Sequence, residues 1–202
     1  MTELIYCDES LLVVNKPAGL LSVPGRGEDK QDCLSARVQQ EFPGALVVHR
    51  LDMATSGLLI FARGDAIQRR LSEMFRERRV LKRYVAVVSG VLEDDDGQID
   101  LPVGADWPNR PRQKIDAEQG KLSLTRYRVL ARNAETTRLE LEPVTGRTHQ
   151  LRVHMAAIGH PIIGDALYGG RAAERLMLHA HILNFAHPFS ADPLSLRSEP
   201  PF

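Results

Sequence analysis

Cysteine is scarce in this chain of 202 residues, which contains only Cys7 and Cys33. Two cysteines exclude a disulfide framework and a four-thiolate zinc site. No apolar run approaches the ~18–20 residues of a membrane-spanning helix, and the start of the chain has neither the basic region nor the apolar stretch of a signal peptide. The sequence therefore predicts a globular cytoplasmic protein with no membrane partner.

An excess of charge of either sign is also absent, because 26 basic residues balance 26 acidic ones. The distribution is uneven, however, since eight basic and three acidic residues lie between positions 63 and 90. Affinity for a polyanion depends on the number of phosphates that are neutralised, so a local basic surface is sufficient, although a solvated helix face explains the same pattern. The most closely spaced basic residues are Arg76, Arg78, Arg79, Lys82 and Arg83.

Motifs for nucleotide binding and serine hydrolysis are missing, since G-x-x-x-x-G-K-[ST], G-x-G-x-x-G and G-x-S-x-G do not occur. The seven histidines include His179 and His181, which are spaced to share one face of a strand, and His149 and His154, which miss the four-residue spacing of H-E-x-x-H. We therefore expect hydrogen-bonded or ligand-facing histidines and no metal site.

The pattern of apolar residues and breaks predicts an α+β fold. A hairpin is expected from two extended segments at 4–6 and 11–15, and further strands are expected at 46–48, 58–61, 84–88, 98–101, 122–130, 138–143 and 178–185. Strands outnumber helices and do not alternate regularly with them. This favours a single domain over residues 1–202, with a mixed, mainly antiparallel sheet flanked by helices and loops.

Three helices are predicted from capping residues and breakers. Asp32 is a candidate N-cap for a helix to residue 42, Asp65 for a helix to residue 79, and T-G-R-T-H-Q opens a helix that ends near residue 158. The polar stretch 106–120 contains Trp107 and two prolines and is predicted to be a long loop. The proline-rich end of the chain is expected to lack regular structure.

The segment H-R-L-D-M-A-T-S-G at 49–57 carries a candidate catalytic residue, Asp52, between two predicted buried strands. A carboxylate in that position is costly unless it is paired, although an Asx turn would also explain an aspartate in a loop. The segment G-R-T-H-Q at 146–150 and Arg152 supply cations at a predicted helix start. These cations are suited either to bind a phosphate or to pair with Asp52.

Three ordered motifs resemble the signatures of the RluA-type pseudouridine synthases: H-R-L-D-x-x-T-S-G at 49–57, K-R-Y at 82–84 and G-R-T-H-Q-L-R-x-H at 146–154. The resemblance covers almost the whole chain through N-K-P-A-G at 15–19, H-P-I-I-G-D at 160–165, L-H-A at 178–180 and H-P at 187–188. The stretch D-W-P-N-R-P-R-Q-K at 106–114 is similar to the RluA branch, whose members modify 23S rRNA and an anticodon-loop uridine in tRNA. Many relatives carry an N-terminal S4-like domain, and none is expected here.

The resemblance implies that the chain isomerises uridine to pseudouridine in RNA without a cofactor or a metal. It implies that Asp52 is the catalytic carboxylate, whether it adds to an electrophilic centre or removes a sugar proton. It further implies that Arg50 fills the space left by a flipped nucleotide, that Tyr84 offers its ring to the uracil, and that Arg152 lies opposite Asp52.

RNA contacts are expected from the five closely spaced basic residues at 76–83, from Arg147 and His149, and from the 106–114 stretch. In this stretch Trp107 is suited to stack on a base and Arg110 to reach its edge or a phosphate. The expected partners are a tRNA anticodon stem-loop and 23S rRNA, and the protein is expected to act as a monomer. Two alternatives remain open: a non-catalytic RNA-binding module, which would not require Asp52, and a metal-dependent hydrolase.

Overall fold

The computed structural model describes residues 2–202, and the chain divides into two compact parts. The first part comprises Met1–Lys82 and His179–Pro201, and the second comprises Arg83–Leu178 and Phe202. Strands in both parts are mainly antiparallel, with one parallel pair, so the predicted α+β fold with a mixed sheet is confirmed. None of the helices in residues 2–202 is long and apolar enough to cross a membrane.

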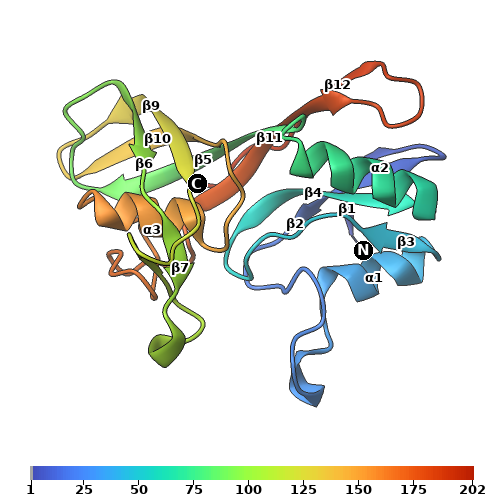
Figure 1. Ribbon diagram of the computed structural model, residues 1–202, viewed down its shortest axis with the longest axis horizontal. Coiled ribbons are helices and arrows are strands. Elements are labelled where there is room, and N and C mark those ends of the chain that lie inside the picture. The colour runs from blue at the N-terminus through green and yellow to red at the C-terminus, as the bar shows by residue number, and fades with distance from the viewer. Residues whose placement is uncertain (1) are drawn as a thin grey trace. The chain divides into compact units, whose positions relative to one another are not determined.

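The first part is built on strands in the order β1-β2-β4-β11, namely β1 (Glu3–Cys7), β2 (Leu11–Lys16), β4 (Ser56–Arg63) and β11 (Leu178–Ala186). Strand β3 (Ala45–Val47) pairs with β4, and β12 (Pro193–Arg197) pairs with β11. The hairpin β1–β2 confirms the predicted one. Helix α1 (Leu34–Glu41) lies against β3, and α2 (Asp65–Arg76) lies against β4, as Figure 1 shows.

The core of the first part lies between β2, β4 and α2. Alternate residues of the two strands point to one face, so Leu11 and Val13 meet Leu58 and Ile60 over the buried side of α2, which contributes Leu71. At the start of β4, Gly57 has φ +113°, and an added Cβ would lie 2.3 Å from the carbonyl oxygen of Ala180. The parallel contact of β4 with β11 therefore requires glycine at this position.

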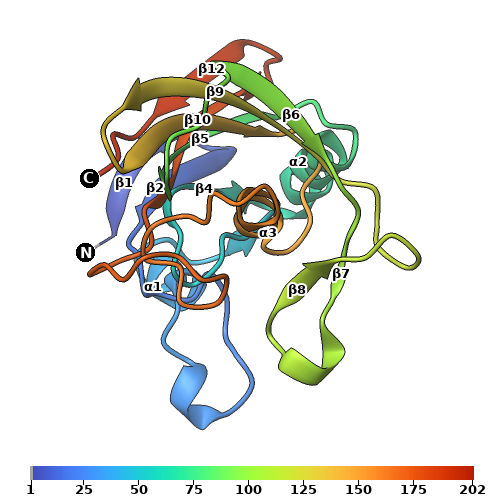
Figure 2. The same cartoon turned by 90° about the vertical axis from the view of Figure 1, so that its left-hand side faces the viewer.

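The second part contains strands in the order β5-β10-β9-β6, all antiparallel, namely β5 (Leu81–Ser89), β10 (Thr136–Pro143), β9 (Leu124–Arg132) and β6 (Asp96–Asp100). A separate hairpin joins β7 (Val103–Ala105) to β8 (Gln113–Ile115). Helix α3 (Gln150–Ala157) contacts β8, β9 and β10. Figure 2 shows α3 end-on beneath β9 and β10, with the β7–β8 hairpin beside it.

Both predicted aspartate caps were wrong. Helix α1 begins at Leu34 with Cys33 at its N-cap, and Asp32 instead accepts hydrogen bonds from Arg37 at 2.8 and 2.7 Å. Helix α2 has Gly64 at its N-cap and ends at Arg76, three residues before the predicted end. It ends early because the chain enters the left-handed region soon afterwards, at Arg78 (φ 61°).

Two stretches predicted to lack regular structure contain strands. Residues 106–120 include the 3-10 helix Trp107–Asn109 and strand β8, and the end of the chain includes β12. Strand β8 has three residues and β12 has five, so each alternates over too short a length to stand out in a polar or proline-rich stretch. They are ordered by pairing with β7 and β11, and local patterns do not report such partners.

Candidate active site and RNA-binding residues

Asp52 lies in the irregular segment that connects β3 to β4, and its side chain is half-buried. The backbone before it is fixed by Ser22, whose Oγ accepts the N–H of Leu51 (3.0 Å) and donates to its carbonyl oxygen (2.7 Å). The backbone after it is fixed by a turn in which the N–H of Thr55 donates to the carbonyl oxygen of Asp52 (3.1 Å). Asp52 is therefore presented by a loop whose main chain is held on both sides.

Lys16, at the end of β2, is fully buried and reinforces the same loop. The carbonyl oxygen of Met53, next to Asp52, also accepts the N–H of Gly19 at 2.9 Å. A buried ammonium group is costly unless its protons are donated to acceptors. Nζ of Lys16 donates to the carbonyl oxygens of Pro17 (2.8 Å), Leu20 (2.7 Å) and Met53 (3.0 Å). The N-K-P-A-G segment therefore anchors the loop that carries Asp52, a role of Lys16 that was not predicted from the sequence.

His49, the first residue of the 49–57 motif, makes its described contacts with the fold around it. Its Nε2 accepts the backbone N–H of Ile60 (3.0 Å), and its ring stacks on Phe75 with centroids 4.4 Å apart. Burial, and then the positive charge of Lys82, lower the pKa of His49 to about 3. The imidazole is therefore neutral at physiological pH, as an acceptor of a backbone N–H must be.

The T-S-G end of the motif is fixed by a buried histidine. A hydrogen bond of 2.8 Å joins Ser56 Oγ to His179 Nδ1, and His179 Nε2 lies 3.1 Å from the carbonyl oxygen of Ser198. His181 Nδ1 is bonded to the same carbonyl oxygen at 2.7 Å. These two histidines thus take part in hydrogen bonding within the fold. Within the described part of the chain, no three His, Cys, Asp or Glu side chains group closely enough to hold a metal ion.

In the second part, Arg152 of α3 is only 5% exposed and forms a two-pronged ion pair with Asp165. Its Nε donates to Asp165 Oδ2 (2.7 Å) and its Nη2 to Oδ1 (2.8 Å). Asp165 Oδ1 also accepts the backbone N–H groups of Leu167 (3.0 Å) and Tyr168 (3.3 Å). Asp52 was the predicted partner of Arg152, and no role was predicted for Asp165. The pairing with Asp52 would join the two parts and stays a prediction.

His149 and Arg147, two predicted RNA-binding residues, precede α3. His149 occupies the N-cap with φ 54°, and a hydrogen bond of 2.6 Å joins its Nδ1 to the hydroxyl of Tyr168. Arg147 is exposed, and its Nε and Nη2 reach the carbonyl oxygen of Leu122 at 3.4 and 3.3 Å. Both side chains are thus oriented by neighbouring groups of the second part.

Tyr84 lies on β5 directly opposite Leu141 of β10. Residues opposite each other on antiparallel strands point to the same face of the sheet. Leu141 is completely buried, whereas Tyr84 is half-buried. The ring of Tyr84 therefore belongs to the inner face of this sheet and is still partly accessible.

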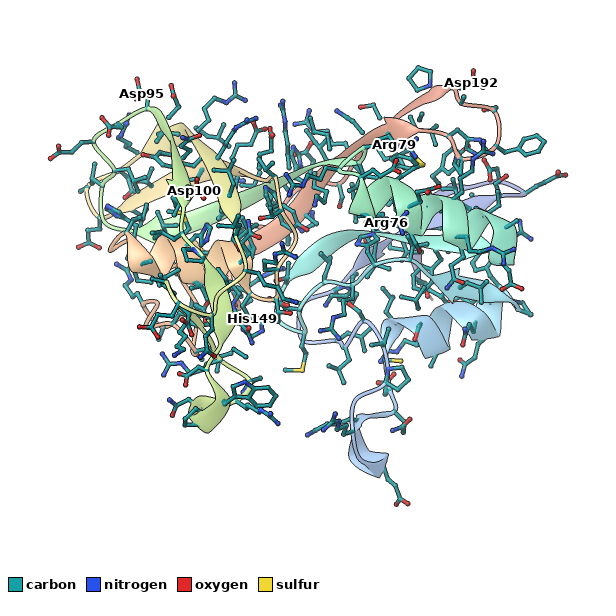
Figure 3. All side chains as sticks on the ribbon, in the orientation of Figure 1. Arg76, Arg79, Asp95, Asp100, His149 and Asp192 are labelled. Atoms are coloured by element: carbon teal, nitrogen blue, oxygen red, sulfur yellow. The ribbon has the colours of Figure 1, made fainter. Side chains whose placement is uncertain are left out.

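The predicted basic residues differ in how freely they can meet phosphates. Arg76 pairs with Glu73 (3.1 Å), Arg79 with Glu77 (2.7 Å), and Arg83 with Glu140 (3.4 Å). Figure 3 labels Arg76 and Arg79 near the C-terminal end of α2. Burial and the nearby charge of Arg78 lower the pKa of Lys82.

Arg78 itself is exposed and has no ion pair with any described residue. Two further exposed arginines of α2, Arg69 and Arg70, were not among the predicted RNA-binding residues and likewise have no ion pair among residues 2–202. The structure therefore shifts the candidate phosphate contacts from the paired arginines toward Arg78 and the middle of α2.

Trp107 is 66% exposed in the 3-10 helix between β7 and β8. The guanidinium carbon of Arg110 lies 3.3 Å from the centroid of its ring, in a cation–π contact. The two side chains expected to bind RNA separately thus form one flat, positively charged stack at the tip of the hairpin.

The family model for RNA pseudouridylate synthase matches residues 10–157, which include the Asp52 loop, β5 and all of α3. The chain belongs to the RNA pseudouridylate synthase family, whose members are isomerases. Among solved structures, the human protein RNA pseudouridylate synthase domain containing 1 is 32% identical, with a TM-score of 0.83 over 100% of this chain and 84% of that one.

Full-length relatives place the chain in the RluA type within this family. A dual-specificity RNA pseudouridine synthase RluA of Yersinia pestis is 50% identical over 203 residues, which cover 98% of both chains. The protein with this name from Escherichia coli is 47% identical over 98% of this chain and 93% of its own. The motif resemblance is thereby confirmed, and the chain is an RNA-modifying isomerase.

Proposed function

We propose that this isomerase acts on two classes of RNA, a tRNA anticodon stem-loop and 23S rRNA, as a monomer in which residues 1–202 form one catalytic domain. The observation that supports dual specificity is the full-length similarity to relatives named dual-specificity enzymes. The exposed Trp107–Arg110 stack gives the second part a surface on which a base can stack. A cytoplasmic location follows from these substrates.

Asp52 is the catalytic carboxylate in this proposal. Pseudouridine formation breaks the bond from N1 of the base to C1′ of the ribose, turns the uracil and joins C5 to C1′. C5 loses its proton to solvent and N1 gains one, so the product is an isomer of the substrate. A loop whose main chain is held by Lys16 and Ser22 keeps the carboxylate in one place during this sequence. The reaction needs no change in redox state and no cofactor.

The other residues act on the nucleotide around the reacting atoms. Arg50, two residues before Asp52, is exposed and suited to occupy the position of a flipped nucleotide. Tyr84 supports the uracil ring, and Arg152 supplies a fixed positive charge opposite the carboxylate. Phosphates are bound by the basic residues at 76–83, by Arg147 and by His149.

Replacement of Asp52 by Asn tests the catalytic assignment, because it keeps the shape of the side chain and removes its charge. We expect a folded protein that binds RNA and releases no tritium from RNA labelled at C5 of uridine, in the presence of a chelator. Asp192→Asn, at an exposed position in the β11–β12 turn, is the matched control and should retain full release. Activity of Asp52→Asn within tenfold of the wild type would refute the assignment. If the wild-type protein itself bound RNA but released no tritium, the non-catalytic RNA-binding module would be favoured.

A further inference from the structure

Tyr168 connects two elements of the second part through its hydroxyl. The hydroxyl oxygen accepts the backbone N–H of Gln113 (2.8 Å), which is the first residue of β8. The same oxygen is hydrogen-bonded to Nδ1 of His149 (2.6 Å) at the N-cap of α3. One side chain therefore joins the loop end of the β7–β8 hairpin to the start of the helix that carries Arg152.

The ring and the backbone of Tyr168 extend these connections. The guanidinium carbon of Arg152 lies 5.1 Å from the ring centroid, and that of Arg112, in the hairpin, lies 5.7 Å from it. The backbone N–H of Tyr168 donates to Asp165, the same carboxylate that holds Arg152. Tyr168 thus contacts the hairpin, the catalytic arginine and the carboxylate that fixes this arginine.

The β7–β8 hairpin needs such support. Its two strands have three residues each and form a sheet of their own, and an isolated two-stranded hairpin is at best marginally stable in water. The stack of Trp107 and Arg110 lies between these strands, on a 3-10 turn whose residues are all exposed. A bond to the N–H of Gln113, at the end of this connection, limits how the stack can move relative to α3.

We propose that Tyr168 is a positioning residue that holds the Trp107–Arg110 stack in a fixed place relative to α3, so that RNA binds to a preformed surface of the hairpin. This inference rests on the proposed function, because it requires the hairpin to contact RNA. Tyr168 acts on binding through the hairpin, and it has no direct part in the chemistry.

The test combines Tyr168→Phe with Trp107→Ala in a double-mutant cycle in the full chain. Tyr168→Phe keeps the ring and removes the hydroxyl. We expect the amide of Gln113 to exchange hydrogen at least fivefold faster in this variant. The Kd for tRNA and 23S rRNA stem-loops should rise about 3- to 10-fold, as the loss of one hydrogen bond implies, and by different factors for the two RNAs. The single-turnover rate at saturating enzyme should stay within about threefold of the wild type.

In the Trp107→Ala background, Tyr168→Phe should change Kd by less than twofold, because the group that the hydroxyl positions is already absent. Tyr127→Phe, a tyrosine of β9, is the matched control and should leave Kd and Gln113 exchange unchanged. Additive effects on Kd, or faster exchange of Gln113 with unchanged Kd for both RNAs, would overturn the proposal. The double-mutant cycle measures RNA binding, whereas the Asp52→Asn experiment measures catalysis. If Asp52→Asn is active, the catalytic assignment fails, but the binding results for Tyr168 can still be interpreted.

Discussion

The two parts of the molecule hold their candidate catalytic side chains by different means. In the first part the structure fixes the main chain around Asp52 through Ser22 and through the buried Lys16, which donates to three backbone carbonyl oxygens. In the second part it fixes the charged group of Arg152 directly, through the carboxylate of Asp165. The described bonds thus hold the main chain on both sides of Asp52, whereas in the second part they hold the guanidinium group of Arg152 itself.

Loss of the Asp165 charge should have the larger effect, because this carboxylate binds two nitrogens of a buried guanidinium. Asp165→Asn is expected to lower the free energy of unfolding by about 3–5 kcal/mol. Under conditions in which the variant is folded, its single-turnover rate should fall about 100-fold, since Arg152 is no longer held in one orientation. Denaturant unfolding and single-turnover assays measure the two effects.

Asp192→Asn, on the exposed β11–β12 turn, is the control for Asp165→Asn and should change neither quantity. If Asp165→Asn does not fold, Arg152→Lys tests the same pair, because lysine keeps the charge and loses the two-pronged geometry. If folded Asp165→Asn or folded Arg152→Lys has the single-turnover rate of the wild type, the ion pair is dispensable for catalysis.

Loss of Lys16 should act on the loop and on stability together. Lys16→Met keeps the length of the side chain and removes the donor to three carbonyl oxygens, so we expect a loss of about 2–3 kcal/mol in the free energy of unfolding. The turnover rate should fall about tenfold, because the segment that presents Asp52 is less rigid. The exposed Lys121→Met should stay within about 0.5 kcal/mol of the wild type. A Lys16→Met protein as stable as this control would contradict the anchoring role.

The smallest expected effect concerns the surface, where paired and unpaired arginines can be compared. Arg78 is exposed and unpaired among the described residues, whereas Arg76 is paired with Glu73. Arg78→Ala should reduce the slope of log Kd against log salt by about 0.7–0.9, the value for one phosphate contact, and Arg76→Ala should reduce it less. Arg37→Ala, which removes an arginine paired with Asp32, is the control. An unchanged slope for Arg78→Ala would show that Arg78 does not contact a phosphate and would favour the interpretation of this surface as a solvated helix face.

Local patterns were sufficient to predict the β1–β2 hairpin, the three helices to within a few residues and the α+β class. They were sufficient because alternation, helical spacing and breakers act between neighbours in the chain. Helix caps were predicted less well. Asp32 has the right residue type for an N-cap, but its carboxylate binds Arg37 instead, and the competition between these partners depends on side-chain geometry.

The sequence by itself determined the family and the motifs that carry Asp52, Tyr84 and Arg152, because these motifs are contiguous. Only the tertiary structure decided what holds them. Lys16 reaches the carbonyl oxygen of Met53 across 37 positions, and β8 and β12 are ordered by strands elsewhere in the chain. Asp165, 13 positions after Arg152, could not be chosen from the other acidic residues until folding buried it. Burial makes an unpaired charge costly, and the fold, not local sequence, determines which partner is within reach.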